Sequence, residues 1–340
     1  MPQERWPMRK LIAMLLCLSS GVVLHAADPN YHVVNETQIG GDGGWDYLIG
    51  DPATRRLYVS HATRVVVADI DTGKVVGEIP DTPGVHGIAI ASDLGRAFTS
   101  NGRANSSTIV DLKTLKPLAT VATGANPDSI RYLQDRKEVW TFNHTGGSIT
   151  AFDPMSGKVI ATIEIGGELE EAVEDSSANR VYVNVEDKGA IAVVDTLKHA
   201  VVATWPLAAC EGPTGLAFDP TNHLLLSACD GKMAVTDSRS GKPVTSFPIA
   251  PRVDGNGFDG ATGLAFASSG TGVLTIAHQD APDKFTVVQT AKTQPSGRTM
   301  WLDPVSHKVY VPVATTTPVP GGRPQVVSGT MKVLVLGSHD

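Results

Sequence analysis

Short apolar runs that end in an acidic residue recur along the chain at a fixed spacing. The five aspartates that end these runs are each 42 residues apart: Asp69, Asp111, Asp153, Asp195 and Asp237. A sixth copy ends 41 residues later, with His278 in place of aspartate. A period of about 40 residues built only from strand-like segments predicts a β-propeller, in which each repeat forms one four-stranded blade.

The segments between the aspartates supply the other strands of each blade. Asp71, Thr72 and Gly73 suit a hairpin turn, because the aspartate side chain bonds its own backbone and glycine accepts a positive φ. The expected strands of the first blade are 46–49, 57–60, 65–69 and 74–79. Those of an atypical sixth blade are 253–258, 263–266, 273–278 and 285–290. The recurrent aspartates are therefore expected to serve as turn residues.

The seventh blade lacks its outer strand at the C-terminal end of the chain. Its first three strands are expected at 299–302, 308–311 and 332–336, and the segment 31–39 resembles the outer strands of the other blades. Pairing of this N-terminal strand with the last blade would close the ring and remove open sheet edges. We therefore predict an all-β, seven-bladed propeller with four antiparallel strands per blade. One long insertion, 315–328, is expected on the rim formed by the loops between second and third strands.

The first 27 residues are typical of a secretory signal peptide. Arg9 and Lys10 precede an apolar stretch, and small residues at Ala26 and Ala27 suit cleavage. An uncleaved membrane anchor is the alternative, and no other stretch is long enough to span a membrane. We expect one propeller domain over residues 28–340, with a periplasmic or secreted location.

The composition is that of a soluble β protein, with 41% hydrophobic residues, 34 Gly and 22 Pro. The formal net charge is −7, and cleavage after Ala27 would make it −9, because that step removes three basic residues and one acidic residue. A chain this acidic has no overall attraction for a phosphate backbone, so nucleic acid is not an expected partner.

Two cysteines, Cys210 and Cys229, remain after the signal segment. An even pair in an oxidising compartment suggests a disulfide. Two small buried thiols are the alternative. A haem attachment site is excluded, because the chain contains no C-x-x-C motif.

Several second strands carry a related sequence: 56–61 reads RLYVSH, 180–184 reads RVYVN and 308–312 reads KVYVP. With the Asp-x-x-x-Gly-Lys-Val-Val turn of 69–76, these segments resemble the YVTN repeat family of β-propellers. The resemblance covers nearly the whole chain after the signal segment. It implies the fold and a secreted or periplasmic protein, and it implies no defined catalytic set. Propellers of related fold include lactonases, haem and quinone enzyme subunits and binding modules.

The starts of the seven inner strands should converge around the central channel. The register selects one position per blade, six of them ionisable: Asp46, His86, Asp128, Glu170, Thr214, Asp254 and Arg298. The ends of the second strands add further polar residues to this mouth: His61, Asn101, Asn143, His144, Glu186 and Asp230. The remaining histidines fall on outer strands or turns and are expected on the surface, among them His199 and His307.

This set of residues predicts a ligand site at the channel mouth, with a simple solvated lining as the alternative. Four carboxylates near one axis repel one another unless a positive charge lies among them. Arg298 could supply that charge as a structural ion pair. A divalent cation could also supply it, held by Asp46, His86, Asp128 or Glu170, which offer oxygen and imidazole ligands.

Three functions remain open from the sequence. The first is a binding module that recognises a small polar or metal-bearing ligand, or a periplasmic protein, at the mouth. The second is a metal-dependent, lactonase-like hydrolase, in which a cation polarises a carbonyl and a carboxylate or His86 acts as base. The third is a non-catalytic or electron-transfer subunit of a periplasmic redox complex.

Overall fold

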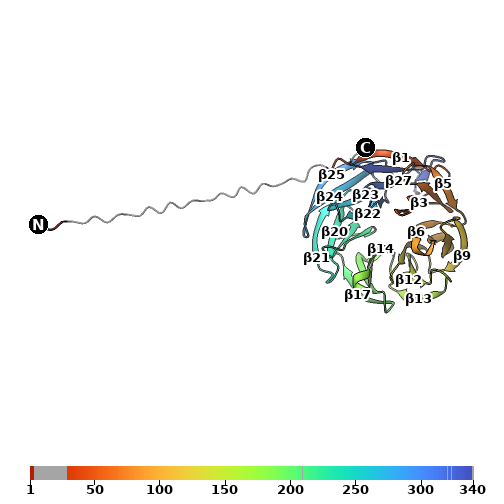
Figure 1. The fold of residues 1–340 in the computed structure, drawn as a ribbon, viewed down its shortest axis with the longest axis horizontal. Helices are drawn as coiled ribbons and strands as arrows, with labels where there is room; N and C mark the ends of the chain where they lie inside the picture. The colour runs from red at the N-terminus through yellow and green to blue at the C-terminus, as the bar shows by residue number, and fades with distance from the viewer. Residues whose placement is uncertain (4–28, 209, 320, 323, 339–340) are drawn as a thin grey trace.

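The structure is a computed structural model that describes residues 1–3, 29–208, 210–319, 321–322 and 324–338. It contains seven four-stranded antiparallel sheets arranged as blades around a channel (Figure 1). The predicted all-β, seven-bladed propeller is confirmed. Residues 4–28, which hold almost all of the predicted signal segment, lie outside the described residues.

Each blade runs from an inner strand at the channel to an outer strand at the perimeter. The inner strands are β2 (Leu48–Asp51), β6 (Val85–Ala91), β10 (Pro127–Leu133), β14 (Leu169–Asp175), β18 (Leu216–Asp219), β22 (Val253–Asp259) and β26 (Trp301–Leu302). The second strands are β3 (Arg56–His61), β7 (Arg96–Asn101), β11 (Glu138–Asn143), β15 (Arg180–Val185), β19 (Leu224–Cys229), β23 (Leu264–Ser269) and β27 (Val309–Val313).

The outer half of each blade follows the same order. The third strands are β4 (Arg64–Asp69), β8 (Ser106–Asp111), β12 (Ser148–Phe152), β16 (Ala190–Asp195), β20 (Lys232–Asp237), β24 (Val273–Ala281) and β30 (Lys332–Gly337). The outer strands are β5 (Val75–Ile79), β9 (Lys116–Ala122), β13 (Val159–Glu164), β17 (Ala200–Pro206), β21 (Pro243–Pro248), β25 (Lys284–Lys292) and, for the seventh blade, β1 (His32–Gln38).

Short 3₁₀ turns are the only helical elements among the described residues. They are η1 (Ser92–Leu94), η2 (Gly102–Ala104), η3 (Ser176–Ala178) and η4 (Glu186–Lys188). Accordingly, no helix within the described ranges has the length and apolar character needed to cross a bilayer.

Burial along the strands explains why the apolar pattern changes across a blade. Strand β12 is buried at every position because both of its faces pack on neighbouring blades, whereas the outer strand β13 is largely exposed. The core between the third and fourth blades includes Trp140, Phe142 and Val183, all completely buried. The inner three strands therefore supply most of the core, and the outer strands face solvent.

The recurrent aspartates form turns, as predicted. The Asp153 carboxylate accepts hydrogen bonds from the backbone N–H of Ser156 and from its hydroxyl, both at 2.7 Å. Asp69 makes the same pair of contacts with Thr72 in the first blade. Gly73 follows with a φ of +67°, a conformation that glycine accepts without a steric penalty.

The N-terminal strand closes the ring, which confirms the predicted topology. Strand β1 pairs antiparallel with β30, and the sheet runs in the order β1-β30-β27-β26. In Figure 1 the red-orange β1 accordingly lies beside the blue C-terminal strands. The predicted insertion follows β27 and contains a small hairpin, β28 (Thr316–Thr317) and β29 (Gln325–Val326).

Two of the histidines expected on the surface also join adjacent blades. His199 Nε2 lies 2.8 Å from the Glu138 carboxylate, and His307 Nδ1 lies 2.7 Å from the Asp259 carboxylate. Both carboxylates are buried, and each adds this contact to hydrogen bonds within its own blade, from Trp140 to Glu138 and from Thr262 to Asp259. No local sequence pattern indicates these two contacts, because each pair joins residues that are far apart along the chain.

Candidate functional site

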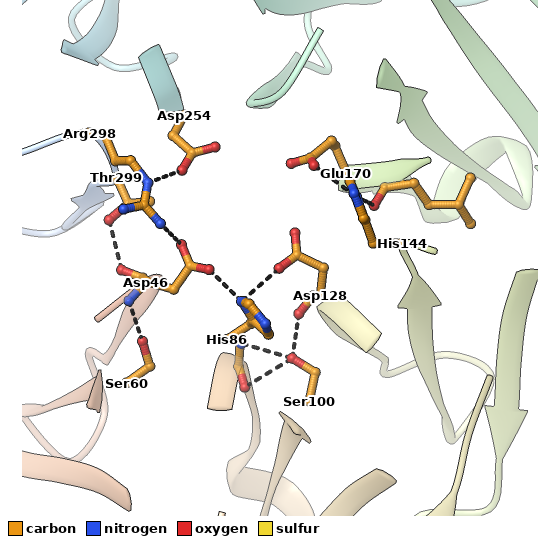
Figure 2. A network of polar contacts seen from close by, with 12 residues as sticks. Asp46, Ser60, His86, Ser100, Asp128, His144, Glu170, Asp254, Arg298 and Thr299 are labelled. Atoms are coloured by element: carbon orange, nitrogen blue, oxygen red, sulfur yellow. Dashed lines mark hydrogen bonds and ion pairs between the residues drawn. The ribbon is translucent and has the colours of Figure 1, made fainter. Parts of the chain in front are cut away.

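Six ionisable side chains gather at one end of the channel, each from a different blade (Figure 2). We call them the mouth ring: Asp46, His86, Asp128, Glu170, Asp254 and Arg298. Four of them are the second residues of inner strands, whereas Asp46 and Arg298 lie just before β2 and β26. The sequence register predicted all six, and the structure brings them together.

A repeated irregularity in the sheets places four of these side chains. The pairing between inner and second strands shifts register across the positions that carry His86, Asp128, Glu170 and Asp254. Such β-bulges redirect a side chain and release the local backbone from regular pairing. The bulges thus allow the second residues of these inner strands to present their side chains at the channel mouth.

One side of the mouth ring is a chain of ion pairs. The Arg298 guanidinium donates through Nε to the Asp254 carboxylate and reaches Asp46 Oδ1 through an Nη atom at 3.1 Å. The other oxygen of Asp46 lies 2.5 Å from His86 Nδ1, and Asp128 Oδ1 lies 3.0 Å from the same nitrogen (Figure 2). Two cationic groups therefore alternate with three carboxylates.

Serine and threonine hydroxyl groups hydrogen-bond to the backbone of the residues that form these ion pairs, and so hold them in place. The Ser60 hydroxyl accepts the N–H of Asp46 at 2.8 Å, and the Thr299 hydroxyl donates to the Asp46 carbonyl at 2.7 Å. In the next blade the Ser100 hydroxyl accepts the Gly87 N–H at 2.8 Å and donates to the Asp128 carbonyl. The ring residues are thus held by contacts within and between blades.

The opposite side of the mouth has a second cluster, made of His144, Glu170 and Glu186. His144 Nδ1 lies 3.0 Å from Glu170 Oε1 and 3.2 Å from the Leu169 carbonyl oxygen. One ligand atom from each of the three side chains lies within 4.8 Å of the others, and the same is true of Asp46, His86 and Asp128. Both groups contain the residue types that hold divalent cations in proteins.

The ion pairs shift the pKa values of the first group in opposite directions. Burial alone would raise the pKa of Asp46, but Arg298 and His86 outweigh burial and lower it. Burial and the nearby Asp46 carboxylate raise the pKa of Asp128, although His86 opposes this rise. Burial disfavours the imidazolium of His86, yet Asp128 and Asp46 raise its pKa to about 10. His86 is therefore a cation at neutral pH.

The two remaining carboxyl groups of the mouth ring, Glu170 and Asp254, have raised pKa values because they are buried among other carboxylates. Burial, together with the Asp128 and Asp254 carboxylates, raises the pKa of Glu170 to about 11. Burial also raises the pKa of Asp254 to about 6, against the opposing effect of Arg298. These shifts mean that the mouth ring holds more acidic groups than its two cations can neutralise.

Further along the inner strands, the channel contains polar residues that the sequence analysis did not predict. A cavity of about 150 Å³ is lined by Tyr47, Ser129, Arg131 and Glu171 together with apolar side chains. The Glu171 carboxylate binds the Arg131 guanidinium and accepts the Ser129 hydroxyl at 3.0 Å. Tyr47, Ser129 and Glu171 each follow a ring position by one residue, so the same register could have identified them.

Burial and the carboxylates of Asp128, Glu171 and Glu170 raise the pKa of Tyr47 well above its usual range. This phenol from the first blade therefore lies within electrostatic reach of the third and fourth blades. It stays protonated and can donate a hydrogen bond into the channel.

Four residues predicted for the mouth have polar side chains that are already bonded within the protein or buried. The buried amides of Asn101 and Asn143 bond to hydroxyls of their own blades, at Thr108 and Thr150. The Thr214 hydroxyl donates to the Val253 carbonyl of the next blade at 2.9 Å. His61 is fully buried close to Gly41, where burial and Arg64 lower its pKa. Side chains at strand ends alternate between faces, so end position alone did not specify their direction.

The two cysteines form a disulfide, the pairing that the sequence had left open beside two free thiols. Cys210 and Cys229 are both buried, and their Cα atoms lie 5.4 Å apart. The bond ties the end of β19 to the segment before β18, on the same face of the fifth blade as the mouth ring.

Comparisons with known proteins support the fold alone. No protein-family model matches the chain, and no curated protein matches it in sequence. A hydrazine synthase structure from Kuenenia stuttgartiensis matches with a TM-score of 0.71 at 13% identity, covering 84% of this chain and 96% of that one. The WD40 repeats of RRP9 match with a TM-score of 0.75 at 11% identity, covering 91% and 98%. Membership of the YVTN repeat family stays a prediction.

Proposed function

We propose that this protein is a binding module whose channel mouth takes a small polar ligand that carries positive charge. A β-propeller fold suggests a binding or scaffold role, and the charged side chains of the mouth ring indicate which kind of ligand would bind there. The observation that carries the proposal is the convergence of four carboxylates and only two cationic groups on one axis.

The charge of the ring favours a cation over an anion. Asp46, Asp128 and Asp254 share Arg298 and His86, which leaves at least one negative charge unbalanced. Burial and the Asp128 and Asp254 carboxylates raise the pKa of Glu170 to about 11, so this fourth carboxyl group is protonated at pH 7 and can release its proton when a cation binds beside it. A ligand that brings an ammonium, a guanidinium or a metal ion would supply the balancing positive charge, whereas an anionic ligand would be repelled.

A protein partner that presents a lysine or arginine side chain would satisfy the same chemistry. We further propose a periplasmic or secreted location. The Cys210–Cys229 disulfide supports this part of the proposal, since such bonds persist in oxidising compartments.

Calorimetry on the full chain tests the proposed function, with putrescine and agmatine as cationic probes and succinate as the anionic probe. We expect the cationic probes to bind. Asp128→Asn combined with Asp254→Asn should weaken them by more than about tenfold, because hydrogen bonds to charged groups contribute roughly 1.5–3 kcal/mol each. Asp283→Asn, at an exposed position away from the mouth, is the matched control. Binding of succinate alone, or equal binding by the double variant, would refute the proposal.

A further inference from the structure

The cluster of His144, Glu170 and Glu186 differs from the other side of the mouth in how its charges are balanced. His144 follows the end of β11, Glu170 begins the bulged start of β14, and Glu186 begins η4 after β15. Adjacent third and fourth blades thus bring one imidazole and two carboxylates within 4.8 Å of one another. The three side chains come from rigid strand ends rather than from long loops.

Glu170 is a buried carboxylate that lacks a hydrogen-bond donor. Its residue is 7% exposed, and its side chain points into the mouth (Figure 2). Among the described residues, no hydrogen bond with acceptable geometry reaches its carboxylate. His144 Nδ1 lies 3.0 Å from its Oε1, but the hydrogen bond of this nitrogen goes to the Leu169 carbonyl instead. A carboxylate this buried ordinarily has donors around it, so a missing partner is indicated.

The Glu186 carboxylate lies within 4.8 Å of ligand atoms of His144 and Glu170 and has no partner outside this cluster among the described residues. In the part of the chain that the structure describes, no hydrogen bond or ion pair reaches its carboxylate. Lys188, two residues further on, is directed away and donates to the Gly166 carbonyl at 2.9 Å. By contrast, the Asp46 and Asp128 carboxylates already enclose the His86 imidazole. In that group each carboxylate has an ion-pair partner, whereas in the cluster of His144, Glu170 and Glu186 the Glu186 carboxylate has none among the described residues.

We propose that His144, Glu170 and Glu186 form a binding site for a divalent transition-metal ion at the channel mouth. An imidazole nitrogen with two carboxylate oxygens is a ligand set suited to Zn²⁺ and its neighbours rather than to Ca²⁺ or Mg²⁺. Three protein ligands leave a coordination position open toward the channel, where a ligand atom can bind. This inference deepens the proposed function, since it names the positive charge that the mouth takes.

Titration of the metal-free full chain with Zn²⁺ alone, followed by calorimetry, tests the site. We expect about one equivalent to bind. Glu186→Gln and His144→Gln should each weaken binding by at least about tenfold, the scale seen when groups supporting a metal are lost. Glu186 is partly exposed and unpartnered, so Glu186→Gln should fold normally, and circular dichroism verifies this.

A matched control separates this site from adventitious binding at surface histidines. His278 Nδ1 lies 2.9 Å from Asp280 in an accessible pair, so His278→Gln should leave Zn²⁺ affinity unchanged. The inference fails if the chain binds no Zn²⁺, if both cluster variants bind as the unmodified chain does, or if only His278→Gln loses binding. Binding of organic cations without Zn²⁺ would overturn this inference and leave the proposed function standing. Binding of neither would overturn both.

Discussion

Gly50 lies directly against the indole of Trp301, at the contact between the first and seventh blades. A Cβ atom on Gly50 would lie 2.1 Å from Trp301 Cη2, so the ring or the strand would have to move. We predict that Gly50→Ala destabilises the protein by about 1–3 kcal/mol, the usual cost of overpacking. Gly44→Ala is the control, because its Cβ would meet nothing within 4 Å. Urea denaturation measures both, and equal midpoints would contradict the packing argument.

His86 is the residue at which pH should act on stability. Asp128 and Asp46 raise its pKa to about 10, above the ordinary value of 6.5. The stabilisation from the imidazolium is therefore fully present below about pH 6.5 and is lost as pH rises through 10. Arg298 also faces Asp46 and stays charged throughout this range.

We predict that His86→Gln lowers stability by about 1.5–3 kcal/mol at pH 7, the contribution of a hydrogen bond to a charged group. The difference in melting temperature between the two proteins should shrink steadily from pH 7 to pH 10. Groups that do not contact His86 titrate equally in both proteins, so the difference reports on His86 and the two carboxylates that face it. A difference that stays constant across this range would contradict the assigned charge.

Among single residues, the sequence predicted the members of the mouth ring better than it predicted their neighbours. Asp46, Glu170 and Arg298 could be identified because a fixed repeat places them at equivalent positions around one axis. The burial of His61 and the partners of Asn143 could not be predicted, since the direction of each side chain depends on how the strand end packs. The bulges that direct the ring side chains inward leave no recognisable pattern in the sequence.

At the scale of elements, the local sequence predicted individual strands and turns better than it predicted the contacts between blades. The β17 segment alternates between partly buried and exposed positions, and the Asp153 turn depends on residues three apart, so both can be recognised in a short window. The bounds differed by up to three residues at strand ends: the first inner strand is Leu48–Asp51 rather than 46–49, and β24 ends at Ala281 rather than at 278. Contacts between blades, such as His199 with Glu138, join distant residues and escaped prediction.

The Cys210–Cys229 disulfide should stabilise the fifth blade. It closes a separation of 19 residues and ties the segment before β18 to the end of β19. A cross-link of this span removes loop entropy from the unfolded chain and should stabilise by about 2–4 kcal/mol. We predict that the double variant Cys210→Ala with Cys229→Ala unfolds at correspondingly lower urea concentration.

Dithiothreitol provides the control for this prediction. It should lower the urea midpoint of the unmodified chain and leave that of the double variant unchanged. An unmodified chain that is insensitive to reductant would show that the bond does not contribute to stability.

At the scale of the whole molecule, ring closure depends on one strand from the far end of the chain. β1 supplies the outer strand of the seventh blade through its pairing with β30, and Lys332 Nζ binds the Glu36 carboxylate at 2.8 Å. Tyr31 adds a hydrogen bond to the His307 carbonyl at 2.8 Å. Without these residues the edge of β30 would be exposed, and exposed edges pair with other chains.

We therefore predict that deletion of residues 29–38 lowers the melting temperature and causes self-association through β30. Light scattering after size-exclusion chromatography measures the association, and circular dichroism follows melting. Deletion of residues 1–28 alone is the control, because it leaves β1 in place. A synthetic peptide of residues 29–39 should restore the monomer by adding a strand to the open edge. A deleted protein that remains monomeric with an unchanged melting temperature would show that the ring does not need its N-terminal strand.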